Sequence, residues 1–436
     1  MNNRNSIARY FQFSEHGTSY SREIIAGLTT FLAMAYVLFV NPAILGDAHM
    51  DKGAVYTATV LGAVFGTLFM GIVARYPIAI APGMGLNAFF TYSVVIAKGI
   101  PWQTALAGVF IAGVIFVIIT LFKIREKIIN AIPQNLKHAT ACGIGLFIAF
   151  MGLKNAGIVV SSKDTLVAFG DITDPKTLLT IFGILITIVF LVLNVKGGIF
   201  FGMVLTAIAG VVFGLLPLPH QVVSSVPSLA PTFGVAIEHI TDINTGQLII
   251  VVLTFLFVGF FDTAGTLMAV ANQAGLLRDN KLPRAGRALL ADSSSIVVGS
   301  ILGTSPTTAY IESSAGVAAG GRTGFASVVT AILFLIALFF SPLLVVVTNQ
   351  VTAPALIIVG VLMASSLGKI EWDRIEIAIP AFLTIITMPL TYSITTGIAL
   401  GFVVYPITMI LKGRIKELHP LMYVLFVIFV IFLPFL

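Results

Sequence analysis

Two carboxylic acids lie inside segments that are apolar enough to cross a lipid bilayer. Asp262 is in LTFLFVGFFDTAGTLMAV (253–270) and Glu312 is in GTSPTTAYIESSAGVAAGG (303–321), and neither segment contains a Lys or Arg. A charged side chain at the bilayer centre costs roughly 2.5–3.5 kcal/mol on insertion scales, so such a residue usually lines a polar cavity or a ligand path. These two acids therefore mark the candidate functional site.

The chemistry that these acids offer is hydrogen bonding and proton exchange. A carboxylate accepts two N–H bonds side by side, and such charge-assisted bonds are strong. Together with the carboxamide of Asn87, the two acids suit a planar neutral ligand that carries ring N–H donors and carbonyl acceptors, such as a purine. An acid in a desolvated pocket can also take up and release a proton near neutrality. Asp262 and Glu312 are therefore candidates for proton coupling as well as for ligand binding.

A third acid, Asp292, lies in the apolar segment RALLADSSSIVVGS (287–300). The three serines that follow it, Ser293, Ser294 and Ser295, offer local hydrogen bonds, which favours a structural role. Proton coupling is the alternative role for Asp292.

The composition indicates the environment in which these acids lie. Of the 436 residues, 58% are hydrophobic and only 10% are charged, and the mean hydropathy is +1.05. Soluble proteins have about 45–50% apolar and about 25% charged residues, so the chain is predicted to be an integral membrane protein in a lipid bilayer. A single cysteine, Cys142, excludes an internal disulfide and a multi-thiolate metal site, and we expect neither a metal nor a cofactor.

Fourteen apolar segments have about the length needed to span a bilayer, which requires ~20 helical residues. They lie at about 22–45, 54–74, 78–96, 101–122, 137–153, 177–195, 198–216, 247–270, 285–302, 305–320, 323–348, 351–367, 375–392 and 393–411. With fourteen crossings, 19 of the 24 Lys and Arg residues fall on one side. The positive-inside rule assigns that side to the cytoplasm, with the N-terminal tail (1–21) and residues 412–416. Because the basic residues lie in short loops, the net charge of +6 does not indicate a nucleic-acid partner.

The two halves of the sequence show traces of a duplication. Thr30-Phe31-Leu32 recurs as Thr254-Phe255-Leu256, and Pro82 and Pro306 are separated by the same 224 positions. These matches fall in corresponding segments of two sets of seven, 22–216 and 247–411. An odd number of crossings gives the halves opposite orientations, which is the inverted repeat common in secondary transporters. Coincidence in a low-diversity apolar sequence is the alternative explanation.

The third and tenth segments are interrupted in equivalent places. Pro82-Gly83 and Ser305-Pro306 break any preceding helix, because proline lacks a donor and glycine tolerates unusual backbone angles. Each segment is therefore predicted to be a short extended strand followed by a half-helix, and such pairs indicate a midplane binding site. Glu312 lies six residues after Pro306 and Asn87 lies five after Pro82. The sequence has no complete dinucleotide fingerprint around Gly83 and no GxxxxGK[ST] motif, so nucleotide binding is not expected.

Several runs of the sequence resemble purine permeases of the nucleobase–ascorbate transporter superfamily. They are GLTTFLAMAYVLFVNP (27–42), APGMGLNAFF (81–90), FFDTAGTL (260–267) and TSPTTAYIESSAGVAAGGRTG (304–324). Together with FQFSEHGTSYSREIIAGLTTF (11–31), they are most similar to the AzgA-like branch, which holds fungal hypoxanthine–adenine–guanine permeases and bacterial guanine/hypoxanthine permeases.

This resemblance implies an all-α polytopic fold of about 14 transmembrane segments as a 7+7 inverted repeat, with short strands in segments 3 and 10. It implies a core domain (22–122 and 247–348), a gate domain (128–216 and 351–411) and a C-terminal segment (412–436). It also implies substrate binding by Asp262, Glu312, Asn87, Ala88, Tyr310 and Thr308, proton symport and, in many members, a homodimer. Several relatives carry another acid three residues before Asp262, where this chain has Gly259, so a coupling scheme with two acids in that segment does not apply.

The sequence therefore predicts a proton-coupled importer of purine nucleobases that works by alternating access in the cell membrane. Guanine and hypoxanthine are the expected substrates. An adenine-selective permease and, less favoured, an anion or sulfate carrier of the same fold are the alternatives within transport. An intramembrane protease is disfavoured because FFDTAGTL and AYIESSAG lack a GxGD pattern, so no enzymatic activity is expected. Residues 421–436 are apolar but short for a span, and we expect them to lie at the interface or to insert partway.

Overall fold

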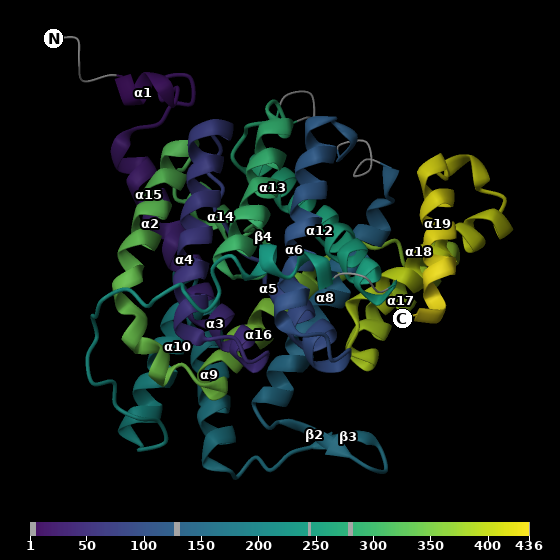
Figure 1. The fold of residues 1–436 in the computed structure, drawn as a ribbon. Helices are drawn as coiled ribbons and strands as arrows, with labels where there is room; N and C mark the ends of the chain where they lie inside the picture. Colours follow the sequence, from purple (N-terminus) through teal and green to yellow (C-terminus); the bar gives the residue numbers. More distant parts are fainter. Residues whose placement is uncertain (1–5, 126–130, 243–245, 278–281, 436) are drawn as a thin grey trace.

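The protein is an all-helical, multi-pass membrane protein with two short two-stranded sheets (Figure 1). The structure is a computed structural model that describes residues 6–125, 131–242, 246–277 and 282–435. In this part of the chain nine helices are long and apolar enough to cross a membrane. They are Tyr20–Asp47, Lys52–Ala74, Trp102–Leu121, Gln134–Asn155, Pro175–Val192, Ala285–Leu302, Gly324–Val346, Asn349–Lys369 and Ile394–Leu411. Shorter apolar helices occupy further predicted crossings, among them Met84–Ala97, Gly198–Val212 and Ile375–Thr391.

The elements follow one another in two runs. The first run is α1 (Ser6–Tyr10), α2 (Tyr20–Met34), α3 (Val37–Asp47), α4 (Lys52–Phe69), η1 (Met70–Ala74), β1 (Ile80–Pro82), α5 (Met84–Ala88), η2 (Phe89–Ala97), α6 (Trp102–Leu121), α8 (Gln134–Asn155), β2 (Val159–Ser162), β3 (Leu166–Phe169), α9 (Pro175–Val192) and α10 (Gly198–Val212). The second run is α11 (Val235–Glu238), η3 (Ile240–Asp242), α12 (Gly246–Gln273), α13 (Ala285–Leu302), β4 (Thr307–Ala309), α14 (Ser313–Ala318), α15 (Gly324–Ala337), η4 (Leu338–Val346), α16 (Asn349–Ala364), η5 (Ser365–Lys369), α17 (Ile375–Thr391), α18 (Ile394–Leu411), η6 (Ile415–Glu417), α19 (Pro420–Phe432) and η7 (Leu433–Phe435).

The predicted strands of the third and tenth segments are confirmed as β1 and β4, which pair antiparallel. The register places Ile80 opposite Ala309, Ala81 opposite Thr308 and Pro82 opposite Thr307. Two further backbone bonds extend the ladder, from Gly83 N to the Pro306 carbonyl (3.0 Å) and from Tyr310 N to the Ala79 carbonyl (3.0 Å). All six strand residues are buried, so the strands lie inside the protein, as non-helical backbone at membrane depth must.

Side chains satisfy the backbone groups that the short ladder leaves over. The Thr67 hydroxyl on α4 donates to the Ile80 carbonyl (2.9 Å) and accepts from the Ile80 N–H (3.0 Å). The Ser313 hydroxyl at the start of α14 accepts from the Ala79 N–H (3.0 Å). An unpaired buried backbone group costs free energy comparable to a lost hydrogen bond, so these hydroxyls are part of what allows strands at this depth.

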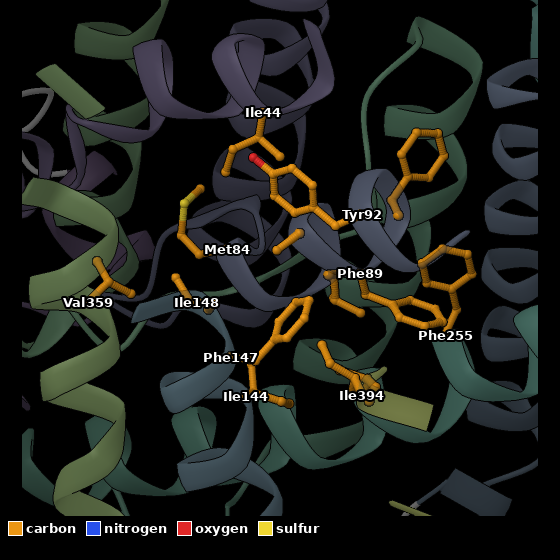
Figure 2. Packing of buried hydrophobic residues seen from close by; sticks show 14 of the residues in the cluster. Ile44, Met84, Phe89, Tyr92, Ile144, Phe147, Ile148, Phe255, Val359 and Ile394 are labelled. Atoms are coloured by element: carbon orange, nitrogen blue, oxygen red, sulfur yellow. The ribbon is translucent and has the colours of Figure 1, made fainter. Parts of the chain in front are cut away.

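The helices pack in two neighbourhoods. In the first, α2, α15, α4, α13, α6 and α12 pack in succession, each against the next. In the second, α18, α17, α8, α16, α9 and α10 pack in the same way. Between the two neighbourhoods, Met84 of α5 and Phe89 of η2 lie near Ile144, Phe147 and Ile148 of α8 in a continuous apolar cluster (Figure 2). The predicted core and gate domains contain these same helices. That the two domains move relative to each other remains a prediction.

Two features were not anticipated in detail. Residues 159–169 form the β2–β3 hairpin, with Val159 opposite Phe169 and Ser162 opposite Leu166, and it projects from one end of the helical bundle (Figure 1). The C-terminal helix α19 packs beside α18. Its Phe429 ring centroid lies 4.9 Å from that of Phe257 on α12 and 5.3 Å from that of Phe402 on α18, so α19 bridges helices from both neighbourhoods.

Small residues allow close helix crossings, as expected where lipid supplies no hydrophobic drive between helices. Where α8 crosses α16, a Cβ added at Gly360 would lie 2.4 Å from the Gly145 carbonyl oxygen, and one at Gly145 would lie 2.8 Å from the Gly360 oxygen. A backbone atom cannot move aside as a flexible side chain can. We conclude that this crossing requires glycine on both helices.

Replacing Gly360 by alanine is therefore expected to destabilise the protein, by roughly 1–3 kcal/mol as for other overpacked sites. The measurement is the thermal unfolding temperature of purified protein in detergent. Gly368→Ala is the matched control, because a Cβ there meets nothing within 4 Å. An equal effect of both substitutions on the unfolding temperature would contradict the close crossing.

Candidate functional site

The β1–β4 ladder brings the two interrupted segments together. After β1 the chain turns at Gly83 and enters α5, and after β4 three residues, Tyr310, Ile311 and Glu312, lead into α14. The Tyr310 hydroxyl donates a hydrogen bond to the Pro82 carbonyl, so the end of one strand is tied to the end of the other. The interruptions at Pro82 and Pro306, which are 224 positions apart in the sequence, thus lie side by side in the β1–β4 ladder.

Glu312 occupies the N-cap position of α14 and is half-buried. Its Oε1 accepts a hydrogen bond of 2.7 Å from the hydroxyl of Tyr36. Tyr36 is buried at the break between α2 and α3, where the first span interrupts its helix. Tyr36 was not predicted as a site residue, although it lies within the run 27–42 that carries the resemblance. The phenol gives the Glu312 carboxylate a fixed orientation.

Thr308 lies in β4 opposite Ala81, and its side chain is buried toward α12. Its Oγ1 lies 3.1 Å from Oγ1 of Thr263, the residue that follows Asp262 in the chain. Asp262 itself is in helix α12, but its side chain lies outside the part that the structure describes. The structure places Thr263 beside β4, while the contacts of Asp262 stay a prediction.

Asn87 is fully buried in α5, and Ala88 at the end of the same helix is buried as well. The Asn87 Nδ2 donates to Oδ1 of Asn41 (2.9 Å) on α3. Within the described residues no partner is found for the Asn87 Oδ1, which is buried. The carboxamide thus has a hydrogen-bond acceptor available.

Asn41 is the centre of a buried polar network behind α5. Its Nδ2 donates to Thr59 Oγ1 (2.7 Å) and to Thr304 Oγ1 (2.9 Å), and its Oδ1 also accepts from Ser305 Oγ (3.2 Å). Asn41, Thr59, Thr304 and Ser305 are all fully buried. The network joins α3 and α4 to the residues just before β4, so it fixes the position of Asn87.

Asp292 is fully buried and pairs with Arg125, whose Nη2 lies 2.7 Å from Asp292 Oδ2. This corrects two expectations. The sequence places Arg125 in a basic loop, whereas the structure buries it just after α6. The expected local bonds from the serines to Asp292 are replaced by bonds from Arg125 and from Thr263 (3.0 Å to Oδ1). Ser293 instead binds Arg125, and Ser295 binds Thr307.

Gly259 lies on α12, three residues before Asp262. A Cβ at Gly259 would lie 3.0 Å from the ring of Phe116, and that ring lies 4.3 Å below the guanidinium of Arg125. Phe116 therefore fills the space into which a longer side chain at position 259 would extend. No group of three His, Cys, Asp or Glu that could hold a metal ion occurs among the described residues.

Comparisons with known proteins agree with this architecture. The model of the Permease family matches residues 21–400. The guanine/hypoxanthine permease PbuG of Bacillus subtilis is 63% identical over 95% of this chain and 96% of that protein. The adenine permease AdeQ of Escherichia coli is 44% identical over 96% of this chain and 94% of that protein. The transmembrane domain of the cyanobacterial bicarbonate transporter BicA has a similar fold, with a TM-score of 0.64 at 16% identity, covering 87% of this chain and 97% of that one.

The buried network makes a prediction about stability. Thr59→Val removes an acceptor of Asn41, and leaving a buried amide unsatisfied costs about 1–3 kcal/mol, so the unfolding temperature in detergent should fall. Thr395→Val is the matched control, because the Thr395 hydroxyl is buried without a hydrogen-bond partner among the described residues. Its replacement should be neutral or stabilising. A smaller loss for Thr59→Val than for Thr395→Val would show that the network contributes nothing.

Proposed function

This chain belongs to the Permease family, a family of transporters rather than enzymes, and from that premise we propose that it imports purine nucleobases, guanine and hypoxanthine first. The support for this substrate class is twofold. A relative that is identical at more than half of its positions is named a guanine/hypoxanthine permease. The residues gathered at the β1–β4 ladder offer the hydrogen-bond acceptors that such a base requires.

The observation that carries the proposal is the arrangement around Glu312. Its carboxylate, oriented by Tyr36, accepts two neighbouring N–H groups of a flat heterocycle. Thr308 in β4 and position 262 on α12 form the adjacent wall, since Thr263 contacts Thr308 directly. Asp262 is the second acid of the proposed site, and Asn87 contributes its buried carbonyl, for which no partner is found in the part of the chain that the structure describes. Main-chain groups near Ala88 and Tyr310 complete the set.

We assign the coupling proton to Glu312, with Asp262 as the alternative. Asp292 is less suited, because Arg125 and Thr263 already occupy both of its oxygens. Glu312 is half-buried and is oriented by a neutral phenol, so protonation there breaks no ion pair. Concentrative uptake is then driven by the proton gradient and should collapse with a protonophore.

Transport follows an alternating-access cycle in which the core shifts against the gate. In the proposed topology, fourteen crossings in two inverted halves place both the N-terminus and residues 412–416 in the cytoplasm. Ser93 on η2 then lies at the outer side, where its Oγ donates to the Tyr392 carbonyl at the end of α17 (2.8 Å). Asn155 on α8 donates to the Tyr92 hydroxyl nearby (3.2 Å). These bonds hold core to gate and must break when the site opens outward.

An adenine-selective permease is the second candidate, because an adenine permease also aligns along almost the whole chain. Competition decides between the two candidates. Unlabelled guanine should suppress uptake of labelled hypoxanthine at lower concentrations than adenine does, and the reverse order would establish the adenine-selective alternative.

Replacing Glu312 by Gln should abolish high-affinity uptake. Loss of a hydrogen bond to a charged group is worth about 1.5–3 kcal/mol, so we expect uptake of labelled hypoxanthine to fall about 10- to 100-fold in cells lacking their own carriers. Glu371→Gln is the matched control, since Glu371 is exposed and bonds Arg374 on the surface. Normal uptake by the Glu312→Gln protein, at equal amounts in the membrane, would refute the site.

Cross-linking the outer contact should stop transport. In a Cys142→Ser background, Ser93→Cys and Tyr392→Cys together allow a short bismaleimide to join core and gate. We expect uptake to fall to background after cross-linking, whereas either cysteine alone should transport normally after the same treatment. Full uptake by the cross-linked protein would contradict relative motion at this contact.

A further inference from the structure

We propose that the buried pair Arg125–Asp292 orients a chain of hydroxyl groups so that Thr308 presents a hydrogen-bond acceptor to the substrate. This inference rests on the proposed function, because it takes the purine as the ligand next to β4. It assigns a positioning role to Arg125, Asp292 and Thr263, and a specificity role to the hydroxyl of Thr308.

The first step is the ion pair. Arg125 and Asp292 are both fully buried, and Nη2 lies 2.7 Å from Oδ2. The guanidinium also donates from Nη1 to Ser293 Oγ (2.8 Å) and to the Leu289 carbonyl (3.2 Å). Phe116 supports it from one face, with the ring centroid 4.3 Å away. Burying two charges is costly unless each is paired and hydrogen-bonded. Here Nη1 and Nη2 of Arg125 and both oxygens of Asp292 have partners, whereas the buried Nε of Arg125 has none among the described residues.

The second step concerns Oδ1 of Asp292, the carboxylate oxygen that does not contact the Arg125 guanidinium. Oδ1 of Asp292 accepts from the Thr263 hydroxyl at 3.0 Å. A carboxylate can only accept, and a threonine hydroxyl has a single proton. Thr263 therefore spends its proton on Asp292, and its oxygen faces Thr308 as an acceptor.

The third step sets the direction of the Thr308 hydroxyl proton. Its Oγ1 lies 3.1 Å from Thr263 Oγ1, and since Thr263 has no second proton to give, Thr308 must donate. The single proton of Thr308 points toward α12, so what remains of its oxygen is lone pairs. A ligand beside β4 then faces the lone pairs of Thr308 Oγ1. An N–H group of the ligand can hydrogen-bond there, whereas an acceptor group of the ligand would be repelled.

The charge of Asp292 is what gives this chain of hydrogen bonds a single direction. A neutral partner in place of Asp292, such as an amide, could donate as well as accept, and the direction of the hydroxyl protons would no longer be fixed. Arg125 holds the carboxylate in place from the side opposite Thr263. The pair thus acts on specificity through two hydroxyl groups and also holds β4 through the Ala309 N–H, which bonds Asp292; it needs no contact with the ligand.

The test is hypoxanthine and adenine affinity of purified protein, measured by equilibrium binding at constant folded fraction. Thr263→Val removes the link, so we expect hypoxanthine affinity to fall about three- to tenfold and its ratio to adenine affinity to change. Thr263→Ser should restore both values, because serine keeps the hydroxyl. Thr120→Val is the matched control: Thr120 is buried and contacts Ser293 (3.2 Å) on the other side of the ion pair, and its loss should leave affinity unchanged.

The double variant Arg125→Met with Asp292→Leu examines the pair itself. Replacing both charges by apolar groups is tolerated in many proteins. We expect at least the loss seen for Thr263→Val, because Asp292 also accepts a hydrogen bond from the Ala309 N–H of β4. Adding Thr263→Val to the double variant should cause no further loss. Unchanged affinity ratios in Thr263→Val, or an equal loss in Thr120→Val, would overturn the inference even where this double variant does not fold. Wild-type protein that binds no purine would instead overturn the proposed function.

Discussion

The backbone pairing of β1 with β4 is the constraint on which the rest of the structure depends. At membrane depth every N–H and C=O must find a partner within the protein, and two three-residue strands cannot satisfy all their groups through each other. Thr67 and Ser313 supply partners from neighbouring helices. Because the strands come from opposite halves of the sequence, one ladder fixes α5 and α14 relative to each other. A site built on both is rigid without a large sheet.

Buried polar side chains form two groups on either side of this ladder. On one side, Asn41 gathers Asn87 and the residues before β4. On the other, Thr308 connects through Thr263 to Asp292. Buried polar groups are costly unless they are bonded, and their concentration here is what the proposed ligand site requires. The surrounding helices meet through apolar side chains and glycine.

The sequence was sufficient for what depends on local pattern. Pro82-Gly83 and Ser305-Pro306 predicted the strands. Apolar length predicted fourteen crossings, and nine helices of the described residues are long and apolar enough to be such crossings. The sequence could not supply contacts between residues distant along the chain. Arg125 looks like one more basic residue in a loop, because no residue near it in the sequence indicates that it pairs with Asp292. Tyr36 reads as a core aromatic within an apolar run, since the bond to Glu312 spans 276 positions.

The shared fold does not by itself determine the ligand. The transmembrane domain of a bicarbonate transporter has a similar fold at 16% identity, and one fold can carry different functions. The difference lies in the few side chains around the ladder. In the proposed site, an anion would face the carboxylate of Glu312 and the lone pairs of Thr308, both of which would repel it. A flat base with N–H groups satisfies the same acceptors, so in the proposed site the direction of the hydrogen bonds selects a purine.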